Sequence, residues 1–269
     1  MMKRIIDFMK NAYLGIIFFF LYAPIATMVV LSFNANKSRG KWGGFSLKWY
    51  KEMFADRGIM DALQVTLLIA FVSAFVATII GVLSCIGINS MRKTPKAIWL
   101  SINNIPLLNA DIVTGLSLML CFITFKWTLG YSSILIAHIS FNIPYVILSV
   151  MPKLKQTSNS LYEAALDLGA TPTRAFFKVI FPDLIPGIVS GFLLSFSMSI
   201  DDFVITHFTK GRGINTLSTL IYSQAKRGVK PSMYALSTLL FMSVLILLLI
   251  SNFLPKAKER STKKLQKQR

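Results

Sequence analysis

The sequence predicts an all-α integral membrane protein with six transmembrane helices. Hydrophobic residues make up 54% of the 269 residues and charged residues only 15%, which is too little charge for the surface of a soluble domain of this size. The apolar residues gather in six segments, each reaching the roughly 20 residues that a spanning helix needs. These lie near residues 11–33, 62–89, 97–124, 131–150, 186–208 and 232–254.

Each segment is expected to be helical because lipid offers the backbone no hydrogen bonds, so every peptide group must be paired within the segment. Residues 11–33 are predicted to be a retained first span rather than a signal peptide, since the apolar run is too long and lacks a small-residue cleavage site. Residues 1–10 then form the N-terminus and 255–269 a basic tail.

The distribution of Lys and Arg predicts the orientation. Seventeen of these residues lie in the two termini and in the connections 90–96 and 151–185, whereas twelve lie in the other three connections. The positive-inside rule therefore predicts cytoplasmic termini and a cytoplasmic 151–185 loop. A net charge of +18 is expected beside anionic lipid and does not indicate a nucleic-acid partner.

Residues 151–185 form the long polar connection on that side. Ser160 is expected to cap a short helix, with Glu163 completing a capping box. Gly169 is expected to end this helix in the left-handed conformation, and Thr171 to cap a second one. Two short helices at a turn form a knob that can enter a groove on a partner and transmit rigid-body motion; the alternative is an interfacial helix lying on lipid.

Three carboxylates, Asp111, Asp201 and Asp202, lie in the apolar segments, which contain no Lys or Arg. Placing a carboxylate at mid-bilayer costs roughly 2.5–3.5 kcal/mol of insertion free energy. We therefore expect each of the three to have a functional or structural role. In continuous helices Asp111 and Asp201 would lie at similar depths, about 21–23 Å from the cytoplasmic ends, and His138 would reach a comparable depth. Acidic side chains at one depth of the membrane, with no basic side chain beside them, suit a small, multiply charged cation.

Other interpretations of these residues stay open. Asp201 and Asp202 are about 100° apart on a helix, so only one is expected to face a cavity, and either could accept hydrogen bonds from Ser or Thr of neighbouring helices. His138 could be a hydrogen-bonded packing residue. Cys85 and Cys121 lie in apolar segments and are expected to be packed and unreactive.

The outer connection 34–61 is rich in Gly and aromatic residues, including Trp42, Phe45, Trp49 and Tyr50. Such a stretch either docks an extracytoplasmic protein or lies in the interfacial aromatic belt.

One sequence pattern is shared with a known family. Glu163, Ala164 and Ala165 are followed by three residues and Gly169, then by nine residues and a Val-Ile-Phe-Pro ending at Pro182. This spacing resembles the EAA loop of permease subunits of bacterial ABC importers, although Val179 and Phe181 stand where that family more often has Ile and Leu. The stretch from Ser199 to Phe203 is similar to the corresponding stretch of spermidine/putrescine permeases.

The resemblance implies a type I ABC importer permease fold in the bacterial inner membrane. It implies an ATP-binding cassette ATPase dimer, a second homologous permease and an extracytoplasmic polyamine-binding protein as partners. The chain is then not an enzyme, and it has no phosphate-binding loop of the Gly-x4-Gly-Lys-Ser/Thr type. No cofactor and no metal site are expected.

Two alternatives remain at this point. A related ABC importer permease could carry ferric iron or another small cation. A stand-alone secondary transporter or channel could use the Asp residues as a relay, although the sequence shows no inverted repeat, which such proteins often have.

Overall fold

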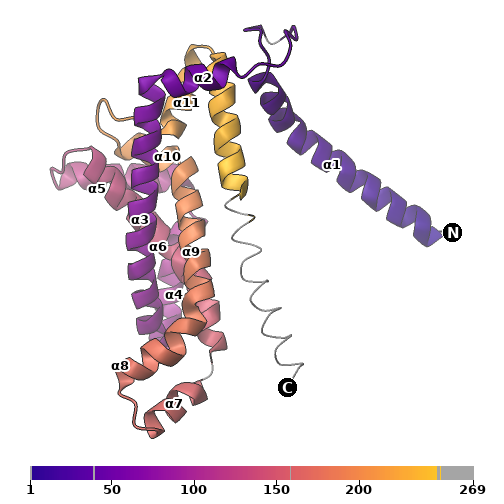
Figure 1. The fold of residues 1–269 in the computed structure, drawn as a ribbon. Helices are drawn as coiled ribbons and strands as arrows, with labels where there is room; N and C mark the ends of the chain where they lie inside the picture. The colour runs from indigo at the N-terminus through magenta and orange to yellow at the C-terminus, as the bar shows by residue number, and fades with distance from the viewer. Residues whose placement is uncertain (1, 39, 158, 247–248, 250–269) are drawn as a thin grey trace. The chain divides into compact units, whose positions relative to one another are not determined.

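The computed structural model describes residues 2–38, 40–157, 159–246 and 249, and its named elements are helices (Figure 1). The chain divides into two compact units. Unit 1 comprises Met1–Met60 with Ile221–Ser243, and unit 2 comprises Asp61–Leu220 with Val244–Arg269. The predicted all-α class is confirmed.

In the described part of the chain, four stretches of helix are long and apolar enough to cross a membrane: Ala12–Ser32 within α1 (Met2–Ser32), Arg57–Asn89 (α3), Tyr131–Gln156 (α6) and Pro172–Asp201. A bent pair of helices makes a fifth span if the pair counts as one. Pro231–Ile246 is a shorter apolar helix, and part of the last predicted span, up to residue 254, lies outside the described residues.

The third apolar segment is broken. Residues Lys93–Leu108 form α4 and Asp111–Thr124 form α5, and the two helices are bent by 104°. Asn109 and Ala110 between them are extended, with ψ of 149° and 137°. Pro106 predicts a kink in the segment 97–124, but the helix is interrupted outright at Asn109 and Ala110. The depth that a continuous helix gave for Asp111 is therefore wrong. Pro106 and the neighbouring Asn residues are poor helix formers, so a break at this point costs little free energy.

Unit 2 is built on close packing of α3, α6 and α9 (Phe181–Asp201). Val146 of α6 lies at the contact: a Cβ on Gly81 of α3 would be 2.6 Å from its Cγ1, and one on Gly191 of α9 would be 3.4 Å from its Cα. Glycine at these positions lets the helices approach, which is how membrane helices gain van der Waals contact without a hydrophobic driving force.

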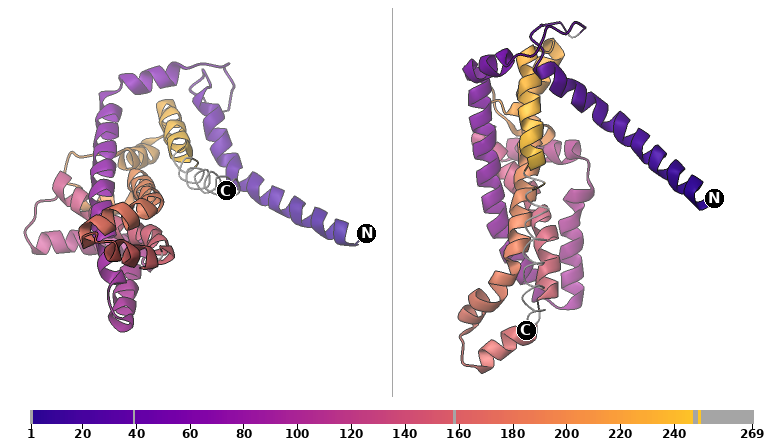
Figure 2. Two further views of the ribbon diagram at one scale, coloured as in Figure 1. Left: turned by 60° about the horizontal axis from the view of Figure 1, so that its bottom comes forward. Right: turned by 45° about the vertical axis from the view of Figure 1, so that its right-hand side comes forward.

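One end of unit 2 carries α7 (Asn159–Asp167) and α8 (Pro172–Ala175), as Figures 1 and 2 show from three directions. Gly169 has φ of +84°, and the Ala170 N–H donates to the Ala165 carbonyl at 3.0 Å, so the predicted left-handed helix end is confirmed. The Thr171 side chain accepts from the Arg174 N–H, which confirms the second cap. Because α7 begins at Asn159, Ser160 lies inside its first turn rather than before it.

The second short helix does not end before the membrane segment. It continues through a π-helical turn, Phe176–Ile180, into α9, so Pro182 lies in the first turn of α9 rather than at the end of a loop. Proline lacks an N–H and its ring clashes with the carbonyl four residues earlier. The turn before Pro182 is correspondingly wide, and the Phe181 N–H donates to the Phe176 carbonyl five residues back.

Unit 1 contains a folded loop, between α1 and α2, that is organised by Asn34. Its side-chain oxygen accepts from the N–H groups of Asn36 (3.1 Å) and Gly43 (2.8 Å), and its amide donates to the Lys41 carbonyl at 3.0 Å. The indole of Trp49, in α2 (Lys48–Ala55), donates to the Asn34 carbonyl at 2.6 Å. This aromatic, Gly-rich loop is therefore a defined structure held by hydrogen bonds.

Candidate functional site

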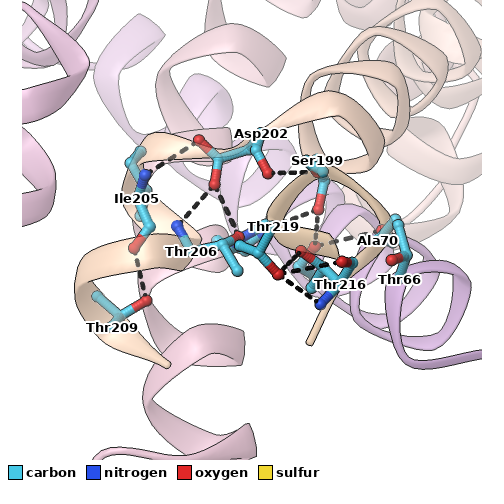
Figure 3. A network of polar contacts seen from close by, with 12 residues as sticks. Thr66, Ala70, Ser199, Asp202, Ile205, Thr206, Thr209, Thr216 and Thr219 are labelled. Carbon is cyan, nitrogen blue, oxygen red and sulfur yellow. Dashed lines mark hydrogen bonds and ion pairs between the residues drawn. The ribbon is translucent and has the colours of Figure 1, made fainter. Parts of the chain in front are cut away.

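The fifth apolar segment breaks at Asp202. Helix α9 ends at Asp201, Asp202 is extended (φ −60°, ψ 122°), and a short helix α10 follows over Val204–Thr209. The carboxylate of Asp202 accepts from the Ile205 N–H at 3.2 Å and from the N–H and hydroxyl of Thr206, both at 2.8 Å (Figure 3). Asp202 therefore caps α10, a role expected of Asp at a helix start.

His138 of α6 supports this carboxylate from a buried position, with 1% of its surface exposed. Its Nε2 lies 3.5 Å from Asp202 Oδ2 and 2.9 Å from the Thr206 hydroxyl, and its Nδ1 lies 2.6 Å from the Ser199 hydroxyl. The prediction that His138 reaches the depth of the acidic pair is confirmed, and so is its interpretation as a hydrogen-bonded buried residue.

The backbone carbonyls freed by the break also find partners. The Ser218 hydroxyl donates to the Asp202 carbonyl at 2.9 Å. Ser218 lies at the start of α11 (Leu217–Arg227), and the Leu217 N–H donates to the hydroxyl of Thr66 in α3 at 2.8 Å. Since an unpaired backbone group in lipid costs several kcal/mol, these bonds make an interrupted helix tolerable at this position.

Further hydroxyls extend the cluster toward α3. Ser199 lies 3.2 Å from Ser73, which also accepts from the Asn142 amide at 3.4 Å. Sequence reasoning missed Ser73, Ser199 and Thr206. Thr206 could have been found from the sequence, because it stands four residues after an Asp. Ser73 and Ser199 are 126 residues apart, so no local sequence pattern indicates that they are in contact.

The three predicted carboxylates have different surroundings. Asp202 is 8% exposed at its side chain, whereas Asp201, one residue earlier, is exposed. The expected separation of about 100° on one helix does not apply, because α9 ends at Asp201 and Asp202 is extended. Asp111 is exposed at the first position of α5. Within the described residues, no group of three or more His, Cys, Asp or Glu side chains could hold a metal ion.

The residues of the EAA pattern lie at the opposite end of unit 2 from the acidic pair along α9. Glu163 and Ala164 are exposed on α7, Ala165 is half-buried, and Gly169 and Pro182 are exposed. A pocket of about 230 Å³ lies beside α7, lined by Ile86, Asn89, Ser90, Leu154, Thr157, Tyr162, Phe176 and Ile180. The α7 helix thus presents its Glu-Ala surface outward.

Residues 4–264 match the family model described as binding-protein-dependent transport system inner membrane component. The match covers nearly the whole chain, and the chain belongs to this family of transport subunits.

Among relatives, the chain is 36% identical over 250 residues to the putrescine transport system permease protein PotI of Escherichia coli K12, covering 90% of this chain and 89% of that protein. It is 34% identical to the spermidine/putrescine transport system permease protein PotC of Haemophilus influenzae, covering 93% and 97%.

Solved structures share the fold at lower identity. A chain of a bacterial alginate ABC transporter, in complex with an alginate pentasaccharide-bound periplasmic protein, superposes with a TM-score of 0.69 at 18% identity, covering 97% of this chain and 96% of that chain. A chain of the MetNI methionine ABC transporter gives 0.62 at 19% identity, covering 75% and 98%.

Proposed function

We propose that the chain is one permease half of an ATP-driven importer of polyamines, with spermidine and putrescine as substrates. The observation that carries this proposal is the extended similarity, over about nine-tenths of both chains, to permeases named for putrescine and spermidine. The apolar segments agree with a cationic substrate, because they contain carboxylates and no Lys or Arg.

The proposed cation contacts are Asp201 and Asp111, whose side chains are exposed in the isolated chain. A polyamine carries ammonium groups separated by methylene chains, so carboxylates at separate positions match it better than one compact cluster. Asp202 belongs to the same acidic site, but both of its oxygens already accept hydrogen bonds within the chain. Asp202 therefore contributes electrostatically: its negative charge attracts the cation without a direct contact.

The proposed topology keeps six spans, with the broken α4–α5 pair as the third and the segment 232–254 as the sixth. Residues 1–10, the loop 151–185 and the tail 255–269 would be cytoplasmic, which is supported by the excess of Lys and Arg in these parts. Within 151–185, the exposed α7 surface with Glu163 and Ala164, followed by the Gly169 turn, is the proposed contact for the ATPase.

The proposed partners are an ATP-binding cassette ATPase dimer, a second homologous permease and an extracytoplasmic polyamine-binding protein. Support comes from the structural neighbours, which belong to ABC transporters, one of them in complex with a periplasmic protein. Because α9 is continuous with the helix that follows the Gly169 turn, motion of α7 and α8 would be transmitted directly to the helix that ends at Asp201.

The test is uptake of labelled spermidine by membrane vesicles that carry the assembled transporter, with unlabelled putrescine and ferric iron as competitors. Putrescine should compete and ferric iron should not. The Asp201→Asn variant should lower the maximal rate about tenfold or more, as expected from loss of a charge-assisted contact of roughly 1.5–3 kcal/mol. The control Asp61→Asn, which neutralises another exposed carboxylate, should not. Competition by iron alone would contradict the substrate assignment.

A further inference from the structure

The break between α9 and α10 is maintained by two residues that the cargo itself need not contact. We propose that His138 and Asp202 are positioning residues: together they keep α10 from continuing α9 and so place the Asp201 carboxylate at the exposed end of α9. This inference rests on the proposed role of Asp201 in binding the cation.

The Asp202 side chain competes directly with helix propagation. In a continuous α-helix the N–H groups of Ile205 and Thr206 would donate to the carbonyls of residues 201 and 202. Here both donate to the Asp202 carboxylate instead. The Asp202 carbonyl, released from the helical pattern, accepts from Ser218. Removal of the carboxylate therefore favours a straight helix, in which the direction of the Asp201 side chain would change.

His138 prevents the Asp202 side chain from leaving this position. The Thr206 hydroxyl has one proton, which it gives to Asp202 Oδ2, so its contact with His138 must be a bond donated by the Nε2–H. The other ring nitrogen is held by Ser199 at 2.6 Å. A buried carboxylate without such support is costly, and His138 comes from a different helix, α6, which α9 packs along.

The alternative is that this cluster is merely structural and that its loss lowers stability alone. A double-mutant cycle separates the two cases, because residues that act through a shared group are non-additive whereas independent sites add. The cycle uses His138→Ala and Asp201→Asn, alone and combined, in the assembled transporter. The maximal rate of spermidine uptake is measured at saturating binding protein and divided by the amount of transporter that copurifies with the ATPase.

We expect each single variant to lower the normalised rate about tenfold and the double variant to be no slower than the slower single variant, the non-additivity expected of residues that act as a unit. His138→Gln, which keeps a side-chain donor, should recover part of the rate. The cycle of His138→Ala with Gly169→Val is the control: Gly169→Val strains the backbone of a distant turn with φ of +84°, and its loss should add to that of His138→Ala. Additive losses for His138 and Asp201 would overturn the proposal and leave the cation site standing, whereas an unchanged rate in Asp201→Asn would remove the cation site itself.

Thr206→Val provides the same test if the His138 variant does not assemble. Valine keeps the shape and the backbone N–H that Asp202 accepts, and removes only the hydroxyl that joins Asp202 to His138. A second readout uses Asp201→Cys in a chain with Cys85→Ala and Cys121→Ser, and measures the rate at which this thiol reacts with a cationic thiol reagent. Thr206→Val should change this rate several-fold; an unchanged labelling rate would contradict a positioning role.

Discussion

Gly115 of α5 and Ile205 of α10 are in backbone contact: a Cβ placed on Gly115 would lie 3.2 Å from the Ile205 Cα. Gly115 is four residues after Asp111, where the third apolar segment resumes, and Ile205 is three residues after Asp202, where the fifth one breaks. The two helices that follow these breaks therefore pack on one another, and the packing requires glycine.

Substitution of Gly115 should disturb both breaks. In Gly115→Val the new side chain meets the Ile205 backbone and also the Val204 carbonyl at 3.4 Å from the Cβ, and overpacking of this kind costs about 1–3 kcal/mol. We expect a lower melting temperature of the detergent-solubilised chain and reduced polyamine uptake. The control is Gly87→Ala, since a Cβ there meets nothing within 4 Å. Equal melting temperatures for Gly115→Val and the native chain would contradict the contact.

The turn at Gly169 should depend on backbone conformation alone. No atom lies within 4 Å of a Cβ built there, but φ is +84°, and a β-branched residue in the left-handed region costs about 1–2 kcal/mol. Gly169→Val should therefore reduce the polyamine moved per ATP hydrolysed. Gly169→Asn should retain more of it, because Asn tolerates this region. If Val and Asn gave the same coupling ratio, backbone conformation at residue 169 would not be what matters.

Removal of the Asn34 side chain should loosen the loop between α1 and α2 of unit 1. Asn34→Ala leaves the Gly43 N–H and the Lys41 carbonyl without their side-chain partner, at about 0.5–1.5 kcal/mol for each hydrogen bond lost. Amide hydrogen exchange across residues 36–43 should become faster. Asn36→Ala, which removes an exposed side chain that accepts from the Ser38 N–H, is the matched comparison and should leave exchange at Gly43 slow.

The two thiols should differ in reactivity, contrary to the expectation that both are packed. Cys85 is fully buried, whereas Cys121 is exposed on α5. Treatment of the detergent-solubilised chain with a small maleimide should modify Cys121 and spare Cys85, which mass spectrometry of the peptides can show. Cys121→Ser should abolish the labelling; modification of Cys85 in that variant would mean that the α3–α6 contact opens.

Much of the local structure was predictable because its causes are local. The Gly169 helix end and the Thr171 cap depend on residues within one or two turns, and the helical class follows from apolar segments that must satisfy their own backbone in lipid. Pro106 predicted a kink in the third segment but not the full break of 104° at Asn109 and Ala110, and the break at Asp202 was not predicted. A hydropathy pattern records only that a segment is apolar, and an apolar segment looks the same whether its helix is straight or interrupted.

The sequence by itself therefore determined the class of protein, the segments available to the membrane and the acidic character of the apolar helices. Only the tertiary structure decided the roles of the two adjacent carboxylates. His138, Ser199 and Thr206 surround Asp202, while Asp201 stays exposed. The physical reason is that a helix in lipid can break only where neighbouring helices supply hydrogen-bond partners, and those partners are distant in sequence.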